Sequence, residues 1–581
     1  MKTNACAPKD MVYEQTQEIL QLTDKKVSTK LPPPRPPTRN KARLYSGPDV
    51  FHRIDNHALQ VARHEHDSFS ELVRELTKAC RSTLEKVRSI FRWITTKDLN
   101  AMMTQGEWTE ASPYYFLQGI RQGAKSYHEL FKRLCSYAGI PVRIIRGLSK
   151  SAGYRPGMQL DDVHFRNSWT AVHLDDEWHF VDCHWGARYV TCSGSGSDAS
   201  SLCYSLDEFY FLTDPEDHVY MHLPDEPQWQ LLAEPLTREQ FVRLPVVKSQ
   251  FFLYGLAFTA NLASVLETAT GRTEVRLRLL SQKPFAFSSR LECEGRIMEG
   301  CCVHYSDDDQ VSFKLSLPSP GVFYFTVFVC DTVESNIYNN VCSFRIDCSR
   351  VKPSPFRSFP KLPDGYGPTR HGLKLGVFSE NYYVVCDEDK LILNLKFRDA
   401  VSISHKLMYG DEPGASSVLD RLVFQRARDR SFVTFLLRLP ERGIYVFSVY
   451  AARMTGDTSV LQCACRYLLQ CNTSASGRIR PYPRTHQFWI RSRLHEPASG
   501  DLKLNKNVKF KLEVENADAV AVIVGQQWFY LRRSGDDDGK LWQGTAHTGN
   551  DARVTADVYV RYAKHERDFF PLLEYKLVSV D

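Results

Sequence analysis

The fold is decided by three short segments: GAKSYHELFKRLCSYAG at 123–139, FRNSWTAV at 165–172 and EWHFVDCHWG at 177–186. In the first, four apolar side chains recur at three- and four-residue steps and predict one face of a helix: Tyr127, Leu130, Phe131 and Leu134. A similar stripe predicts another helix within residues 70–96. Residues 142–146, 168–174 and 178–181 read as short strands. Helices followed by antiparallel strands indicate an α+β domain.

Beyond about residue 245 the pattern changes to short alternating strands, and one unit occurs twice. FKLSLPSPGVFYFTV at 313–327 is echoed by FLLRLPERGIYVFSV at 435–449, and each copy reads as strand, Pro/Gly turn, strand. Each is followed by a strand with two cysteines on one face, CSFRIDC at 342–348 and CRYLLQC at 465–471, which we expect to pack in a core. The spacing of roughly 120 residues is typical of β-sandwich domains.

These patterns predict five segments along the chain. A disordered, proline-rich segment covers 1–45, the α+β domain covers 46–240, and β-sandwich domains cover 245–352, 360–475 and 483–581, the last a diverged third copy. Within the first segment, LPPPRPP at 31–37 indicates an extended polyproline II or disordered stretch. A plain spacer is the preferred interpretation, and docking on a proline-reading groove is the alternative.

Composition excludes several classes of function. The 74 basic and 68 acidic residues give a net charge of only +6, without a basic stripe for nucleic acid. No run of about 18 apolar residues predicts a membrane span, and the N-terminus lacks the apolar core of a secretory signal. The 16 cysteines are therefore expected to be reduced thiols in the cytoplasm. They lack the paired spacing of zinc sites, so we expect neither a metal nor a cofactor.

The three opening segments resemble the transglutaminase-like superfamily. In that family the first segment opens a helix with a nucleophilic cysteine, the second holds a histidine two positions before a tryptophan, and the third holds an aspartate. RNSW at 166–169, DCHWGAR at 182–188 and FLTDPE at 211–216 more closely resemble the kyphoscoliosis peptidase and hillarin group. This resemblance implies a papain-like α+β core followed by Ig-like sandwich domains.

Two of the three catalytic residue types are missing. Ala124, three positions before Tyr127, stands where the family has cysteine, and Asn167, two before Trp169, stands where it has histidine. Only Asp182 is retained. Alanine is no nucleophile and asparagine is no base near neutral pH, so the family's acyl-transfer chemistry is not expected here.

Other residues are candidate substitutes for the missing nucleophile and base. Cys135 lies about 16 Å further along the predicted helix and reads as core. A relocated pair, such as Cys183 with His128, would restore a thiol and a base, and it keeps an enzymatic alternative open. Otherwise His128 and His184 are expected to be solvated or satisfied structural histidines.

A binding cleft can remain in a domain that has lost its catalytic residues. Asn167 and Asp182 are able to hydrogen-bond each other, and Trp178 is expected in the core. Three aromatic side chains could either line a groove or pack in the core: Tyr127, Trp169 and Trp185. The sequence does not decide between these two positions.

We therefore expect a non-catalytic adaptor or scaffold. The resemblance implies partners among cytoskeletal or cortical proteins, while the oligomeric state stays open. The alternative is an active cysteine peptidase or protein-glutamine acyltransferase with a relocated nucleophile. Carbohydrate binding by the β modules has no feature in its favour. Ala124→Cys with Asn167→His is expected to rebuild a reactive thiol if the cleft is intact.

Overall fold

The computed structural model describes residues 31–579 apart from 103–108, 162, 192–200, 282, 307–308, 334–336, 353–358, 361–364, 380–381, 411–418, 455–459, 475–479, 535–538 and 566–567. The chain divides into two compact units, one built mainly from the residues up to Gly255 and the other from most of the rest. Within the described ranges, no helix is long and apolar enough to cross a bilayer.

The first unit is built on a five-stranded sheet in the order β6-β3-β2-β1-β7. All four pairings are antiparallel, as the sequence predicted for its central strands. The strands are β1 Val142–Ser149, β2 Arg166–Leu174, β3 Glu177–Val181, β6 Phe211–Thr213 and β7 His222–Pro224. Two further pairs of short strands are β4 Arg188–Thr191 with β5 Ser201–Tyr204, and β8 Val246–Val247 with a later strand.

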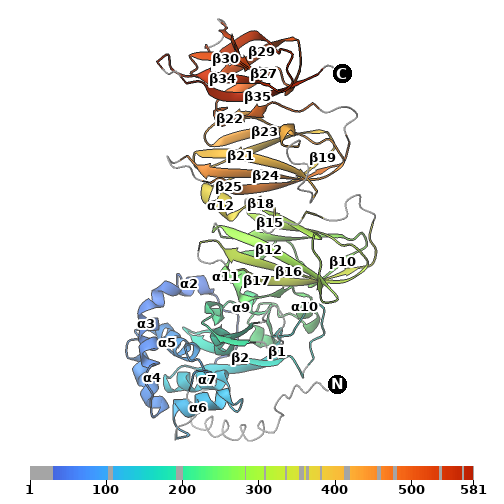
Figure 1. The fold of residues 1–581 in the computed structure, drawn as a ribbon. Helices are drawn as coiled ribbons and strands as arrows, with labels where there is room; N and C mark the ends of the chain where they lie inside the picture. Colours follow the sequence, from blue (N-terminus) through green and yellow to red (C-terminus); the bar gives the residue numbers. More distant parts are fainter. Residues whose placement is uncertain are drawn as a thin grey trace. The chain divides into compact units, whose positions relative to one another are not determined.

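The longer helices gather on one side of this sheet and share one core with it (Figure 1). They are α3 His52–Val61, α4 Phe69–Thr77, α5 Thr83–Thr95, α6 Pro113–Arg121 and α7 Tyr127–Tyr137. The shorter helices of this unit are α2 Lys41–Leu44, α8 Cys183–Ala187, α9 Pro215–His218, α10 Arg238–Arg243 and α11 Ser249–Leu253. The stripes predicted from the sequence are buried, since Leu130, Phe131 and Leu134 of α7 share one core with Val87 and Ile90 of α5. These two helices are therefore confirmed.

The end of the N-terminal segment is more ordered than expected. The indole Nε1–H of Trp178 donates to the carbonyl of Pro32 over 3.2 Å, and the Thr38 backbone N–H donates to Glu177 Oε1 over 2.9 Å. Short α2 then begins at Lys41. The prediction of disorder is corrected for 31–45, because an aromatic donor and a carboxylate hold the segment, and residues 1–30 lie outside the described part.

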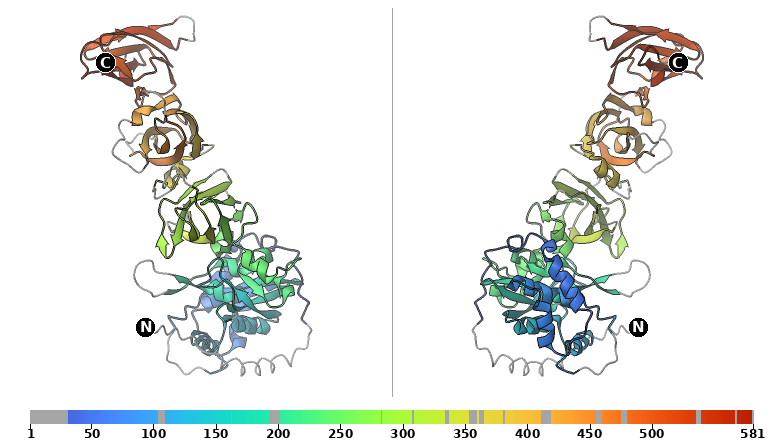
Figure 2. Two further views of the ribbon diagram at one scale, coloured as in Figure 1. Left: turned by 90° about the vertical axis from the view of Figure 1, so that its right-hand side faces the viewer. Right: turned by 90° about the vertical axis from the view of Figure 1, so that its left-hand side faces the viewer.

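The β blocks are pairs of sheets (Figure 2). The first block contains β9 Leu256–Phe258, β10 Val265–Thr268, β11 Arg272–Leu279, β12 Phe285–Cys293, β13 Arg296–Ile297, β14 Cys302–Ser306, β15 Gln310–Ser316, β16 Gly321–Asp331 and β17 Asn339–Cys348. The second contains β18 Gly367–Pro368, α12 Arg370–Leu375, β19 Tyr383–Cys386, β20 Lys390–Lys396, β21 Val401–Tyr409, β22 Val423–Arg428, β23 Phe432–Arg438, β24 Gly443–Arg453 and β25 Gln462–Cys471. The repeated strand–turn–strand units are β15–β16 and β23–β24, as the sequence predicted.

The third block repeats the strand order of the second. Its strands are β26 Arg484–Thr485, β27 Ser492–Glu496, β28 Asp501–Lys503, β29 Asn507–Val514, β30 Ala519–Val524, β31 Gln527–Tyr530, β32 Arg532–Arg533, β33 Leu541–His547, β34 Thr555–Arg561 and β35 Phe570–Val578. One sheet runs β26-β35-β34-β30 where the second block has β18-β25-β24-β21. In both blocks the last strand also pairs in parallel with an early one, β28 with β35 and β19 with β25.

The paired cysteines of each strand pack in a core, as the strand periodicity predicted. Cys342, Cys348, Cys465 and Cys471 are all buried. Burial raises the pKa of Cys465 well above its usual value, so this thiol stays protonated and behaves as a small apolar side chain.

Candidate functional site

Asp182 follows the last residue of β3 and caps α8. Its Oδ1 accepts hydrogen bonds from the backbone N–H groups of His184, at 2.9 Å, and Trp185, at 3.1 Å. A carboxylate in this position satisfies donors that a helix start otherwise leaves free. The side chain is only 1% exposed. Asp182 is therefore fixed in place by the backbone it caps.

The other carboxylate oxygen of Asp182 faces an imidazole that the sequence did not single out. His222, the first residue of β7, places Nε2 3.5 Å from Asp182 Oδ2, and its side chain is fully buried. Burial alone would raise the pKa of Asp182, but His222, His128 and His184 lower it well below its usual value. Asp182 is thus held as a carboxylate inside the domain.

Aromatic rings surround this pair. The His222 ring stacks on His218 at 4.2 Å between centroids and lies 4.7 Å from Trp169 and 4.5 Å from Trp185. Neither ring nitrogen of His222 has a hydrogen bond of good geometry. The site therefore combines one anchored carboxylate with an imidazole packed among rings.

Three neighbouring histidines are held neutral. Burial lowers the pKa of His184 to about 3, and its Nε2 accepts from the Arg188 guanidinium over 2.8 Å. Burial also lowers the pKa of His128, and it lowers that of His218 far below 6.5. Within the described ranges, no group of three or more His, Cys, Asp or Glu side chains is arranged to hold a metal ion.

Ala124 lies outside the helix that was expected to begin there. A capping box forms between Ser126 and Glu129, in which each residue's side chain bonds the other's backbone N–H, so α7 begins at Tyr127. Ala124 is exposed, and its N–H donates to the Gly119 carbonyl over 2.8 Å. A thiol at this position would lie two residues before the cap, away from the helix terminus that favours a thiolate.

Asn167 turns to a different partner from the one expected. Its Nδ2 donates to Ser149 Oγ over 3.1 Å, and its Oδ1 accepts from the Ser168 N–H over 2.8 Å. Asp182 bonds elsewhere, so the predicted Asn167–Asp182 hydrogen bond is corrected. Ser149 lies directly opposite His222 in the β1–β7 pairing, so the Asn167 amide reaches a residue next to the buried histidine.

The two thiols weighed as replacements belong to the core. Cys135 and Cys183 are both fully buried in the cluster beneath the helices. Burial raises the pKa of Cys135, and burial together with the Asp182 charge raises that of Cys183 far above 9.0. A nucleophilic cysteine needs the opposite shift. The prediction that Cys135 packs inside is confirmed.

The aromatic candidates divide between interior and surface. Trp169 is fully buried and Tyr127 is 2% exposed, so neither presents a face to a ligand, and the groove interpretation is corrected for both. Trp185 is half-buried and remains a candidate for a groove wall. Trp178 is 1% exposed, as expected of a core residue, and its indole N–H donates to the Pro32 carbonyl of the N-terminal segment.

Comparison with known proteins agrees with this architecture. The family description "Transglutaminase-like superfamily" matches residues 70–183, and "KY-like, immunoglobulin-like domain" matches 238–360 and 368–483. The chain is 30% identical to Lim and transglutaminase domain protein ltd-1 of Caenorhabditis elegans over 495 residues, 79% of this chain and 68% of that protein. The chain belongs to the transglutaminase-like superfamily, in the kyphoscoliosis peptidase and hillarin group.

Other members of this group align over long stretches. Hillarin of Drosophila melanogaster is 34% identical over 458 residues, which are 73% of this chain and 55% of hillarin. Mouse kyphoscoliosis peptidase is 25% identical over 537 residues, 91% of this chain and 77% of that protein. The chain thus spans little more than half of hillarin's length. The predicted fold class, a transglutaminase-like α+β core followed by Ig-like domains, is confirmed.

His218 and His222 are the site residues of this transglutaminase-like domain that sequence reasoning missed. They lie about 40 residues beyond Asp182, outside the three segments that carry the resemblance. The β1–β7 pairing brings His222 into the site. Spacing gives no signal for this, because β7 is only three residues long.

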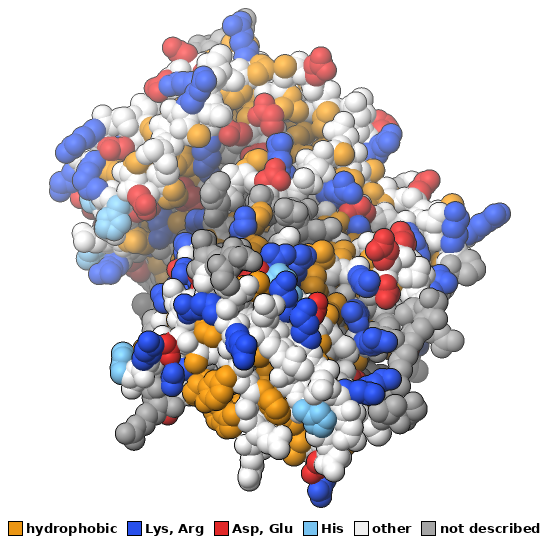
Figure 3. Space-filling view, turned by 90° about the horizontal axis from the view of Figure 1, so that it is seen from above, with side chains coloured by type: hydrophobic (Ala, Val, Ile, Leu, Met, Phe, Trp, Pro, Cys, Tyr) orange, Lys and Arg blue, Asp and Glu red, His pale blue; other side chains and the backbone are white. Residues whose placement is uncertain are grey.

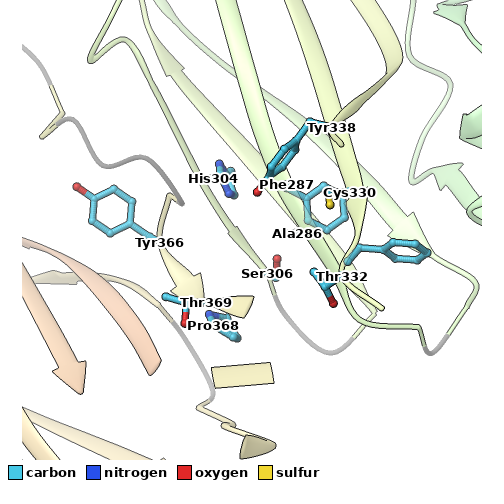
Figure 4. Close-up of a pocket in the computed structure, with 11 residues that line it drawn as sticks. Ala286, Phe287, His304, Ser306, Cys330, Thr332, Tyr338, Tyr366, Pro368 and Thr369 are labelled. Atoms are coloured by element: carbon cyan, nitrogen blue, oxygen red, sulfur yellow. The ribbon is translucent and has the colours of Figure 1, made fainter. Parts of the chain in front are cut away.

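A separate cavity of about 340 Å³ lies in the second unit (Figure 4). Its lining combines aromatic rings with hydroxyl groups and one imidazole, from Phe285, Ala286, Phe287, His304, Ser306, Cys330, Thr332, Tyr338, Tyr366, Pro368 and Thr369. These lining residues do not form the set of cysteine, histidine and aspartate that the family's chemistry uses.

Proposed function

We propose that this chain is a non-catalytic member of its group, an adaptor or scaffold whose transglutaminase-like domain binds proteins without modifying them. The proposal is carried by Ala124, which we assign to the nucleophile position by its spacing from Tyr127 and which lies exposed outside α7. Without a thiol at that position, the acyl-enzyme step of the family mechanism has no atom to form it.

The surroundings of the retained aspartate support the same proposal. Asp182 is engaged by two backbone N–H groups and by His222, and it is buried with them. In a catalytic triad the aspartate orients a histidine whose other nitrogen reaches the nucleophile and the substrate. An Asp182–His222 pair enclosed by Trp169 and His218 instead fits a stabilising role.

We propose partners among cytoskeletal proteins in the cytoplasm. The group resemblance suggests this class, and a 105-residue stretch is 26% identical to a fission yeast protein named cytokinesis protein 3. A surface that interleaves basic and acidic side chains, as on the face in Figure 3, suits protein partners better than nucleic acid.

Thiol reactivity tests the absence of catalysis. We expect an electrophilic thiol probe at pH 6 to label no cysteine of the whole chain much faster than free cysteine. Cys135→Ala and Cys183→Ala serve as matched variants. One thiol that reacts at least tenfold faster than free cysteine, and whose loss abolishes amine incorporation into a glutamine substrate, would contradict the proposal.

The rebuilt variant Ala124→Cys/Asn167→His extends this test. Because residue 124 lies outside α7 and Asn167 faces Ser149, we expect the new thiol to keep an ordinary pKa near 8.5. Binding is tested separately by proximity labelling with the full chain. Enrichment of cytoskeletal proteins supports the adaptor role, and an enrichment without them would overturn it.

A further inference from the structure

Residues 32–39 lie against the β2–β3 hairpin of the α+β domain and contact it at both of their ends. Pro32, Pro34 and Pro37 are half-buried, whereas Pro33 and Pro36 are exposed. A polyproline II helix has three residues per turn, so Pro34 and Pro37 fall on one side of it. The domain therefore covers Pro34 and Pro37 together and leaves Pro33 and Pro36 in solvent.

One tryptophan of the domain contacts this segment directly. The Trp178 indole donates to the Pro32 carbonyl over 3.2 Å. Trp229 and His173 pack against the Trp178 ring, at 5.1 Å and 5.0 Å between centroids, and support it from within the domain. Aromatic grooves bind polyproline segments because these are pre-extended, and tryptophan adds a donor for their free carbonyls.

Charged groups fix the register at the C-terminal end of the segment. The Arg39 guanidinium lies 3.2 Å from Glu177 Oε2 and 3.4 Å from Asp175 Oδ2. Glu177 Oε1 also accepts from the Thr38 N–H over 2.9 Å and from the Thr38 hydroxyl. Asp175 and Glu177 belong to the turn and first residue of the β2–β3 hairpin, so one hairpin provides both the carboxylates and Trp178.

The segment is attached to the domain without being part of its core. The clusters around the sheet contain Trp178, Trp229 and Tyr45, but no buried residue from 31–44. Leu31 is 44% exposed. Its release would therefore cost hydrogen bonds and ion pairs and leave the core in place.

We propose that Trp178, Asp175 and Glu177 form a binding site for a proline-rich segment ending in Thr-Arg, filled here by the chain's own residues 32–39. Covalent attachment gives the internal segment an effective concentration in the millimolar range, so it excludes a free peptide of similar affinity. The site lies at the opposite end of β3 from Asp182, and the proposal holds whether or not the chain is catalytic.

A labelled peptide of residues 30–41, KLPPPRPPTRNK, tests the site. We expect the intact chain not to bind it, and a chain lacking residues 1–39 to bind it in fluorescence anisotropy. Trp178→Phe in the shortened chain removes one donor and keeps the ring, so binding should weaken about tenfold. Trp528→Phe, at a 45% exposed tryptophan of the third block, is the matched control.

A folded shortened chain that does not bind, or that binds equally with Trp178→Phe, would overturn the proposal. A concentration-dependent dimer of the intact chain would show exchange of the segment between copies and overturn the internal assignment. If the shortened chain does not fold, trypsin cleavage after Arg39 in the full chain decides. Glu177→Gln should speed this cleavage about tenfold while Asp176→Asn does not, and equal rates would refute the site.

Discussion

The α+β domain and the second β block bury very different side chains. Around Asp182 the domain encloses His128, His218 and His222, whereas the core of the second block is built from aliphatic and aromatic residues with a few cysteines. A sandwich core follows from strand alternation alone. The interior of the α+β domain instead holds a carboxylate and several imidazoles, and both ring nitrogens of His222 lack a hydrogen bond of good geometry.

The largest difference should appear at the ion pairs. Arg88 is 1% exposed and pairs with Asp55 and Glu208 at 2.7 Å each, while Arg453 of the second block is 54% exposed beside Asp399. We expect Arg88→Ala to lower the free energy of unfolding of the α+β domain by about 3–5 kcal/mol, because two carboxylates lose their partner. Arg453→Ala should cost less than about 1 kcal/mol. Hydrogen exchange of peptides from α5 and β24 measures each region separately, and similar costs would break the comparison.

Asp182→Asn is expected to have the next largest effect on the free energy of unfolding. The amide can still accept from the two α8 N–H groups, but the charge opposite His222 is lost, so we expect a cost of about 2–4 kcal/mol. His222→Gln in the same background tests whether the two side chains act together. A double variant whose cost equals the sum of the single costs would show that they do not.

Acid should affect the α+β domain first. The pKa of His184 falls from 6.5 to about 3 on burial and that of His179 to about 4, so the unfolded chain binds more protons than the folded chain below pH 6.5. The contribution of these histidines to the free energy of unfolding is fully present above that pH. It is lost as the pH falls, by up to about 1.4 kcal/mol per pH unit for each such histidine. The second block has His405, with a pKa near 4. Loss of exchange protection in β24 before α5 between pH 6.5 and 4 would reverse the expected order.

The smallest effect is expected at the β-block cysteines. Cys465 is fully buried, so Cys465→Ala should cost about 1 kcal/mol through the small cavity it leaves. The half-buried Cys463 is the matched control, with a smaller expected cost. Thermal unfolding under reducing and non-reducing conditions should give the same midpoint for wild type. An unfolding midpoint that changes with reductant would mean that these thiols form disulfide bonds and do not only pack in the core.

Local patterns predicted most of the fold and part of the site. The stripe through Leu130 and Leu134 located α7, and the duplicated strand–turn–strand unit located β15–β16 and β23–β24, because helix and strand periodicities are short-range signals. The start of α7 could also have been placed correctly, since Ser126 and Glu129 already spell a capping box.

The remaining parts depend on contacts between distant residues. His222 meets Asp182 through strand pairing, and Asn167 reaches Ser149 across the β1–β2 ladder. Pro32 receives a hydrogen bond from Trp178, 146 residues later. Neither composition nor spacing encodes contacts between residues so far apart, so the sequence could point to Asp182 but not to the groups packed around it.

The parallel pairing in the second and third blocks has a mechanical consequence. β19 runs beside β25 over four residue pairs, and β28 beside β35 over three. Tension that draws two parallel neighbours toward opposite ends slides them along each other, so their hydrogen bonds must break together rather than one after another. Under a stretching force these modules should therefore yield abruptly, at forces well above those that open a hairpin, and single-molecule pulling would register each as a discrete step.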